Sequence, residues 1–313
     1  MTESMPRLEF ERFSSIMERD RATFIPEDAL TKWLHADQLF ARGERKNMNV
    51  YGFEGLVHLQ KFFRLAGERN VGDWLPDDRK IELVEISAAR DRLCAERLKI
   101  EIGDSDILNV AANNAQDYIF QRMYPVLDSQ LPRIVLDFGP GYGRTANLAF
   151  GDLGSATRKL VAVDAIPACY LVQRLYYRGL GLTVADYIDE DGEFDYRRAF
   201  DIHQVIHLPT WRMDMIPTAS IDLICAVQVL KELYGTALVH VLKEFARILK
   251  PGGALYVRDH VQFHRPNQMP IDEMLSVNGF VIEYRPHVKD GIHVRGIPRL
   301  WRKYDTSFYI RDI

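Results

Sequence analysis

Two patterns of apolar residues divide the chain near residue 130. Before that point apolar side chains recur at helical spacing, as over residues 53–65, 79–97 and 106–127. After it, short continuous apolar runs alternate with amphipathic stretches. A short run of β-branched and aliphatic residues suits a strand that is buried on both faces. We therefore expect a mainly helical region over residues 1–130 and an α/β domain over residues 131–313.

The second region predicts strands and helices in alternation. This order favours a mostly parallel sheet with helices on both faces. The last two strands have no clear helix between them, which predicts an antiparallel hairpin that closes the sheet. An acidic stretch over residues 186–201 is expected to be an irregular insertion. The expected strands are residues 134–138, 159–164, 203–208, 221–227, 254–258, 280–284 and 300–304, and the expected helices are residues 168–178, 230–250 and 271–277.

A glycine-rich loop follows the first of these strands. Glycines alternate at positions 139, 141 and 143, and residues 145–150 can begin a helix. Glycine permits sharp turns and lets a ligand approach the backbone closely. A strand, a glycine loop and a helix N-terminus form a nucleotide-type cofactor site at the carboxyl end of a parallel strand. Residues 141–146 also fit the dinucleotide pattern G-x-G-x-x-A, so the loop alone leaves two cofactors open, besides a purely structural turn.

Composition and charge narrow the function classes. The formal net charge of −4 at pH 7 offers no basic surface for a nucleic-acid backbone, so we expect no nucleic-acid partner. No apolar run approaches the roughly 18 residues that span a membrane, and the first residues do not resemble a signal peptide. The three cysteines lie far apart, which is typical of free thiols in a reducing compartment. The expected location is the cytoplasm.

Four segments of the second region resemble the class I S-adenosylmethionine-dependent methyltransferases. They are residues 136–143 (LDFGPGYG), 161–164 (VAVD), 221–224 (IDLI) followed by 228–230 (QVL), and 248–255 (ILKPGGAL). The resemblance implies a Rossmann-like α/β sheet of seven strands, S-adenosyl-L-methionine as the cofactor, and methyl transfer as the reaction.

Two shorter segments point to a finer class of acceptor. Residues 170–180 and 207–211 are similar to sugar methyltransferases of natural-product pathways, in particular to N-methyltransferases that modify amino sugars of aminoglycoside antibiotics. The finer resemblance implies a small sugar or aminoglycoside as the substrate. Methylation of a sugar hydroxyl group remains an alternative.

The resemblance also assigns roles around the cofactor. Asp137 would accept hydrogen bonds from the ammonium end of the methionine tail, which lies over Gly139, Gly141 and Gly143. Asp164, at the end of the second strand, would accept from both ribose hydroxyl groups. The alternative role for Asp164 is a local cap at the end of its strand.

Three further residues would contact the adenine, and one would contact the methionyl group. Ala165 would touch the adenine face, while Trp211 and Arg212 would flank its edge. Many relatives have an acidic residue where Trp211 or Arg212 stands, and a role for Trp211 as a core aromatic is equally consistent with the sequence. Gln228, just past the fourth strand, would face the methionyl part.

Catalysis by methyl transfer depends mainly on alignment of the nucleophile, the methyl carbon and the sulfur. A hydroxyl acceptor also needs a general base, whereas an amine near the lysine pKa of ~10.4 needs little help once it has lost its proton. The candidate bases are Asp259, His260 and Glu232, and Tyr51 could close over the substrate. A surface or turn role for Asp259 and His260, and a helix-capping role for Glu232, remain open.

Three alternatives compete with this assignment. A magnesium site would use Asp259 with His260 and His264, although the carboxylate set that magnesium prefers is not evident, so we expect no metal. An NAD(P)-binding oxidoreductase would use the same glycine loop, but the Pro-Gly-Gly element at 251–253 disfavours it. A catalytically silent methyltransferase fold would serve as a partner subunit. The helical region would cap the substrate cleft and could form a homodimer.

Overall fold

The structure is a computed structural model, and it describes nine parts of the chain. These are residues 4–24, 59, 77–122, 134–150, 157–189, 193–233, 236–259, 270–285 and 296–304. Two of the predicted site residues, Tyr51 and His260, lie outside the described residues. So does the predicted helix over residues 53–65, apart from Leu59.

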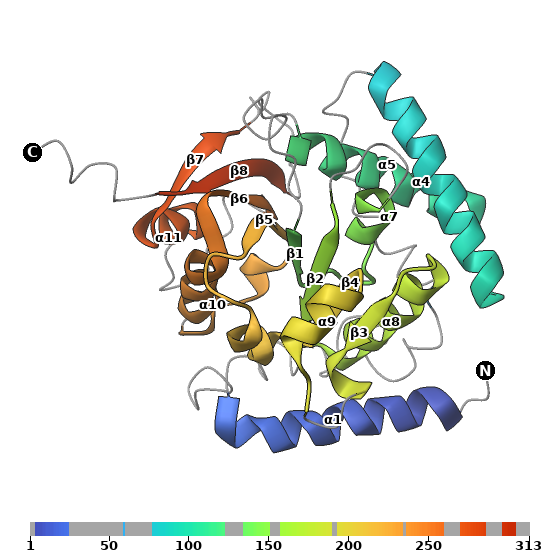
Figure 1. The fold of residues 1–313 in the computed structure, drawn as a ribbon. Helices are drawn as coiled ribbons and strands as arrows, with labels where there is room; N and C mark the ends of the chain where they lie inside the picture. The colour runs from blue at the N-terminus through green and yellow to red at the C-terminus, as the bar shows by residue number, and fades with distance from the viewer. Residues whose placement is uncertain are drawn as a thin grey trace, which may run out of the picture.

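An eight-stranded sheet forms the centre of the described structure (Figure 1). Its order is β3-β4-β2-β1-β5-β6-β8-β7. The neighbours from β3 to β6 pair in parallel, and β8 pairs antiparallel with both β6 and β7. The strands are β1 Ile134–Phe138, β2 Lys159–Asp164, β3 Val184–Asp186, β4 Val205–Pro209, β5 Ile221–Val227, β6 Leu249–Asp259, β7 Phe280–Tyr284 and β8 Ile297–Lys303.

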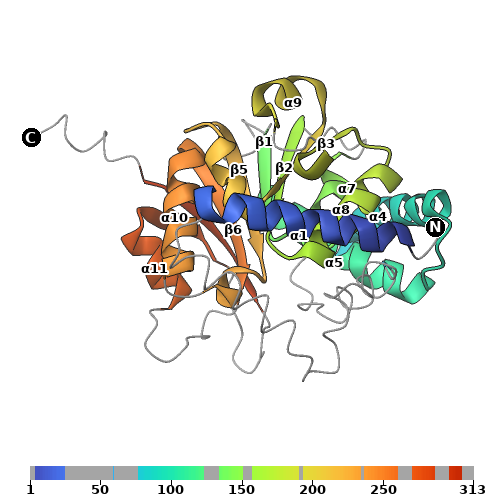
Figure 2. The ribbon, with the colours of Figure 1, turned by 90° about the horizontal axis from the view of Figure 1, so that it is seen from below.

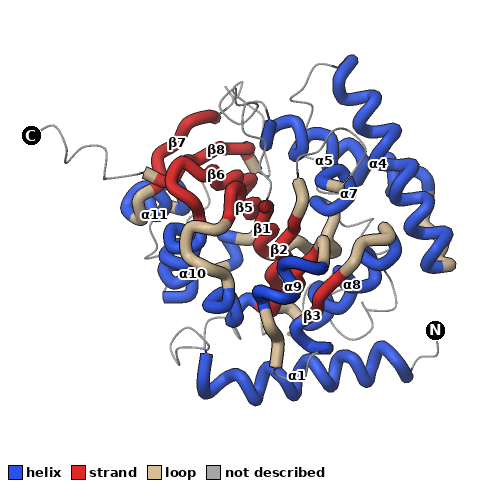
Figure 3. The backbone as a smooth tube through the Cα atoms, viewed as in Figure 1, coloured by secondary structure: helices blue, strands red, loops and turns tan. Residues whose placement is uncertain are grey.

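Helices cover both faces of this sheet, so the domain has three layers (Figure 3). On one face lie α5 Asp104–Arg122, α7 Thr145–Ala149 and α8 Pro167–Gly179. On the other lie α10 Thr236–Ile248 and α11 Ile271–Val277. The short helix α9 Tyr196–Ile202 precedes β4. The mixed α/β fold, mostly parallel with an antiparallel end, is the one predicted from the sequence.

The apolar runs account for the central strands. β1, β2, β4 and β5 are buried along almost their whole length, because helices pack on both of their faces. Between the layers, Phe138 of β1 meets Phe245 of α10 edge to face, with ring centroids 5.1 Å apart. Within the described part of the chain, no helix is both long and apolar enough to cross a membrane.

Three details of the sequence prediction were wrong. The sheet has an eighth strand, β3, at its edge, and the stretch over residues 186–201 holds the end of β3, a 3₁₀ turn η3 (Tyr187–Asp189) and α9 rather than an irregular insertion. The long helix predicted over residues 230–250 is two elements, the 3₁₀ turn η5 (Leu230–Glu232) and α10. The Pro-Gly-Gly element lies inside β6, where the pairing with β5 shifts register.

The N-terminal helices that the structure describes pack directly on this α/β domain. These described helices are α1 Ser4–Phe24, α4 Asp77–Leu98 and α5. α4 approaches α8 so closely that a Cβ atom at Gly179 would lie 2.5 Å from Cys94 Sγ. α1 lies along one end of the sheet (Figure 2), against α8 and the turns that follow β3 and β4.

Candidate cofactor site

The glycine loop lies at the carboxyl end of β1 and has the backbone that its sequence predicts. Gly139, Gly141 and Gly143 have φ angles of +63°, +64° and +95°, which only glycine adopts without strain. A Cβ at Gly139 would lie 2.4 Å from Val229 Cγ2, and one at Gly143 would lie 2.5 Å from Tyr177 Cε1. Among the described residues, nothing lies within 4 Å of a Cβ at Gly141. The loop is therefore pressed against its neighbours at both ends and open in the middle.

Asp137 lies in β1 directly below this loop. Its side chain is 2% exposed, and its Oδ2 atom has no hydrogen-bond partner in the described part of the structure. Burial raises the pKa of Asp137 to about 7, although a hydrogen bond with Thr145 opposes the change. A buried carboxylate oxygen without a partner is costly, so it marks a place that a donor can fill.

Asp164 ends β2 and is also buried, with 4% of its surface exposed. Its Oδ1 accepts the Ile166 N–H at 2.9 Å, and its Oδ2 accepts the side-chain N–H of Gln173 at 2.7 Å. Burial raises its pKa to about 7. A carboxylate has about four acceptor sites, and a backbone hydrogen bond from Ala165 takes a third, so capacity remains for one hydroxyl donor. The bond to Ile166 is the local cap that the simpler interpretation of Asp164 expects.

Tyr177 of α8 completes the inner wall of the loop. Its hydroxyl group is buried and has no hydrogen-bond partner among the described residues. Burial, followed by the charges of Asp137 and Asp164, raises the pKa of Tyr177 well above its ordinary value. Sequence reasoning assigned Tyr177 to packing rather than to the site, because its place beside two carboxylates depends on how α8 packs.

Trp211 and Arg212 lie in the turn η4 (Thr210–Met215) after β4, where α1 packs against Trp211. The Trp211 indole donates to Asp20 of α1 at 3.1 Å and packs edge to face on Phe13. Arg212 donates to the Tyr187 hydroxyl group and to Asp214. Their polar atoms are therefore engaged with α1 and η3, and the role of both residues at the adenine edge stays a prediction, as does that of Ala165.

Gln228 stands at the carboxyl end of β5 in a strained conformation. Its φ angle is +59°, which is uncommon for a residue other than glycine. Its N–H donates to the Arg258 carbonyl at 2.8 Å, and its side-chain oxygen accepts from Lys231. A Cβ at Gly296 would lie 2.4 Å from Gln228 Nε2. Backbone strain of this kind is concentrated at functional sites.

The two described candidate bases differ in burial. Asp259 is fully buried at the end of β6, where its Oδ2 accepts the Lys231 N–H at 3.0 Å and its carbonyl accepts from Arg299 at 3.0 Å. Asp259 thus holds the turn η5 in place. Glu232 is half-buried within η5 and lies four positions before Thr236, the first residue of α10, so its capping role stays a prediction. Catalysis by Asp259, His260 or Glu232 stays a prediction.

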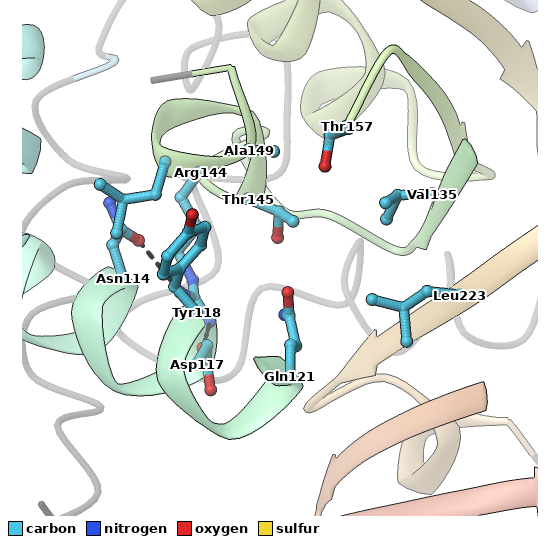
Figure 4. Close-up of a pocket in the computed structure, with 11 residues that line it drawn as sticks. Asn114, Asp117, Tyr118, Gln121, Val135, Arg144, Thr145, Ala149, Thr157 and Leu223 are labelled. Atoms are coloured by element: carbon cyan, nitrogen blue, oxygen red, sulfur yellow. Dashed lines mark hydrogen bonds and ion pairs between the residues drawn. The ribbon is translucent and has the colours of Figure 1, made fainter. Parts of the chain in front are cut away.

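Two further observations complete the site. No three metal-ligating side chains gather among the described residues, which exclude His260 and His264. A pocket opens between α5 and the start of α7 (Figure 4), and Asn114, Asp117 and Arg144 form part of its lining. The pocket lies beside the glycine loop rather than in it, and sequence reasoning did not predict it.

Comparison with known proteins gives the class of the domain. Residues 136–257, less than half of the chain, match the family model described as a methyltransferase domain. No curated protein matches the chain.

Solved structures with a similar fold include three proteins of 14–15% identity. The 1,6-didemethyltoxoflavin-N1-methyltransferase of Burkholderia thailandensis, solved with 1,6-didemethyltoxoflavin and S-adenosylhomocysteine, is 15% identical, and the match covers 75% of this chain and 94% of that one with a TM-score of 0.39. The N-methyltransferase NodS of Bradyrhizobium japonicum is 14% identical over 62% and 97% of the two chains, with a TM-score of 0.39. The YcgJ protein of Bacillus subtilis is 15% identical over 60% and 99%, with a TM-score of 0.41.

The family match and the fold define an S-adenosylmethionine-dependent methyltransferase. Its cofactor is S-adenosyl-L-methionine, and the oxidoreductase and the silent subunit are set aside. The residues present fit this cofactor. The unpartnered Asp137 oxygen suits the ammonium group, and the open side of Gly141 leaves room for the methionine tail.

Proposed function

We propose that this methyltransferase methylates an amino group on a sugar of a small natural product, most simply an aminoglycoside-type amino sugar. The sequence resemblance over residues 170–180 and 207–211 supports this acceptor class. The negative net charge also favours a cationic acceptor. When bound, S-adenosyl-L-methionine supplies the methyl group and the leaving sulfur.

One observation carries the preference for nitrogen over oxygen. Asp259, which ends β6 on the acceptor side of the proposed cleft, is fully buried, and one of its oxygens accepts the Lys231 N–H at 3.0 Å. A sugar hydroxyl needs a base within hydrogen-bond reach, and an Asp259 carboxylate held in this way is poorly placed to serve, which leaves Glu232 and His260 as the candidate bases for a hydroxyl acceptor. A deprotonated amine needs alignment alone.

The residues of the site would then have the following roles in binding the cofactor. Asp137 holds the ammonium group of the cofactor, Asp164 accepts from the ribose, and Gln228 orients the methionyl part. We propose that the helical region over residues 1–130 forms a cap on the substrate cleft. The placement of α1 over the ends of β3 and β4 supports a cap. Three free, buried cysteines support a reducing compartment such as the cytoplasm.

A labelled-methyl screen tests the proposal. Purified protein, labelled cofactor and a panel of aminoglycosides and neutral glycosides are incubated with and without a chelator. We expect label on amino sugars, with the same yield in the presence of the chelator. Label on neutral glycosides alone would assign the enzyme to O-methylation. A loss of activity with the chelator would show that the enzyme needs a metal ion.

A further inference from the structure

A buried chain of hydrogen bonds runs from the glycine loop to the edge of the sheet. The Gln173 side chain of α8, which is fully buried, donates through Nε2 to the Gly141 carbonyl at 2.8 Å and to Asp164 Oδ2 at 2.7 Å. Its Oε1 lies 2.8 Å from Nε2 of His207 in β4. The other ring nitrogen of His207 lies 3.2 Å from Asp186 Oδ2 in β3. One amide thus touches both parts of the cofactor site.

The contacts fix the orientation of the Gln173 amide. Both partners of its Nε2 are acceptors, so a flipped amide would place an oxygen against two oxygens. Its Oε1 must then receive a proton from His207 Nε2, because an unprotonated nitrogen at 2.8 Å would repel it. His207 Nε2 is therefore the donor to Gln173, and a hydrogen bond from Nδ1 to Asp186 Oδ2 requires that this nitrogen carry a proton as well.

Asp186 anchors the outer end of the chain. It accepts the Tyr170 hydroxyl group at 2.8 Å and the Ile188 N–H at 3.1 Å, and it pairs with Arg174 at 2.7 Å. The Tyr170 ring stacks on His207 with centroids 3.7 Å apart. These contacts leave the His207 ring a single orientation, and the strand β3 that the sequence did not reveal supplies the anchor.

We propose that Gln173 and His207 are positioning residues of the cofactor site, which hold Asp164 and the Gly141 carbonyl where the cofactor needs them. The proposal rests on the assignment of Asp164 to the ribose. A carboxylate held before binding loses less freedom when the cofactor arrives, so the chain raises cofactor affinity. It touches neither the acceptor nor the reacting atoms.

The test measures S-adenosylhomocysteine binding by calorimetry, which needs no acceptor. Gln173→Met keeps the length of the side chain and removes its polar atoms. Because Asp164 and the Gly141 carbonyl are then no longer held in place before the cofactor arrives, we expect about ten- to hundredfold weaker binding. With an acceptor identified in the labelled-methyl screen, the KM for the cofactor should rise while kcat at saturating cofactor falls less, a split that a general loss of structure would not produce.

Two variants of His207, the next residue in this chain of hydrogen bonds, provide a rescue experiment. His207→Leu should weaken binding in the same way, because Gln173 Oε1 loses its donor. His207→Gln places an amide nitrogen near the former Nε2 atom, so binding should recover by about tenfold relative to His207→Leu. Asp195→Ala removes only the cap of α9, a 3.0 Å bond to the Arg198 N–H, and serves as a control that lowers stability without changing affinity.

Two outcomes would overturn the proposal, and they can be told apart. If Asp164→Asn binds S-adenosylhomocysteine as tightly as the wild type, the assignment of Asp164 is wrong and the positioning role is wrong with it. If Asp164→Asn binds weakly but Gln173→Met binds normally, or if leucine and glutamine at position 207 bind equally, the positioning role alone is wrong.

Discussion

Replacing Asp137 with asparagine is expected to weaken cofactor binding by about a hundredfold and to stabilise the cofactor-free protein. The carboxylate is 2% exposed, and one of its oxygens has no partner in the described structure. Asparagine keeps its shape but offers the ammonium group no charge. The loss in affinity follows from removal of a buried charge-assisted hydrogen bond.

The gain in stability follows from the same burial. The pKa of Asp137 rises from 3.8 to about 7 in the folded protein. The folded state therefore binds a proton that the unfolded state releases, and stability falls as pH rises from about 4 to about 7. Above pH 7 this difference in pKa between the folded and unfolded states lowers the free energy of unfolding by roughly 4 kcal/mol. We expect Asp137→Asn to recover only about 1–3 kcal/mol of this stability, because burial of the asparagine amide also costs free energy.

The pH dependence of binding checks the assignment. The cofactor favours the ionised carboxylate, so wild-type affinity should increase from pH 6 to about pH 7 and then level. In Asp137→Asn the increase should be shallower, because only Asp164 among these two carboxylates still titrates in this range. Calorimetry with S-adenosylhomocysteine and thermal melts without it give both quantities. Asp222→Asn, at the opposite end of the sheet, is the control, and equal affinity of Asp137→Asn and the wild type would contradict the assignment.

The fold could be predicted largely because its central strands are buried on both faces. Such strands appear as continuous apolar runs, as in β1, β2 and β5. β3 has no such run, because it has only three residues and pairs with β4 alone. Its place depends on Asp186, whose partners come from α8 and β4.

The candidate site could be predicted only where its chemistry is local. The glycine loop and Asp137 are adjacent in sequence, and their geometry follows from residue type. Gln173 could not be identified, because its role depends on Gly141 and His207, which lie 32 and 34 positions away. The hydrogen bond from Trp211 to Asp20 joins two residues that lie 191 positions apart in the sequence. Polar contacts of this range leave no periodic signal in a single sequence.

A buried network of ion pairs at Asp117 leads to the second prediction with a large expected effect, which concerns the stability of the protein. Asp117 lies in α5, is 4% exposed, and pairs with Arg144 beside the glycine loop and with Arg258 of β6 at 2.8 Å. It also accepts the Tyr256 hydroxyl group at 2.6 Å. Burial alone would raise the pKa of Asp117, but the two arginines lower it overall. One carboxylate therefore ties a helix of the N-terminal region to both sides of the site.

Asp117→Leu is expected to destabilise the protein by about 3–5 kcal/mol, because it leaves two arginines buried without their partner. Denaturant unfolding measures the loss, and Asp104→Asn provides the matched surface control. Asp104 pairs with Arg92 at 3.0 Å with side chains 78% and 48% exposed, so its loss should cost at most about 1 kcal/mol.

Replacing the two arginines as well tests whether the loss of stability in Asp117→Leu comes from their unpaired charges. In the triple variant Asp117→Leu, Arg144→Met and Arg258→Met, no buried charge of the network remains, and apolar packing replaces it. If unpaired charge causes the loss, the triple variant should be more stable than Asp117→Leu alone, although it carries more substitutions. A triple variant that is less stable than the single one would show that the network contributes through its specific hydrogen bonds, and the ion pairs would then be a net stabilising link between α5 and the glycine loop.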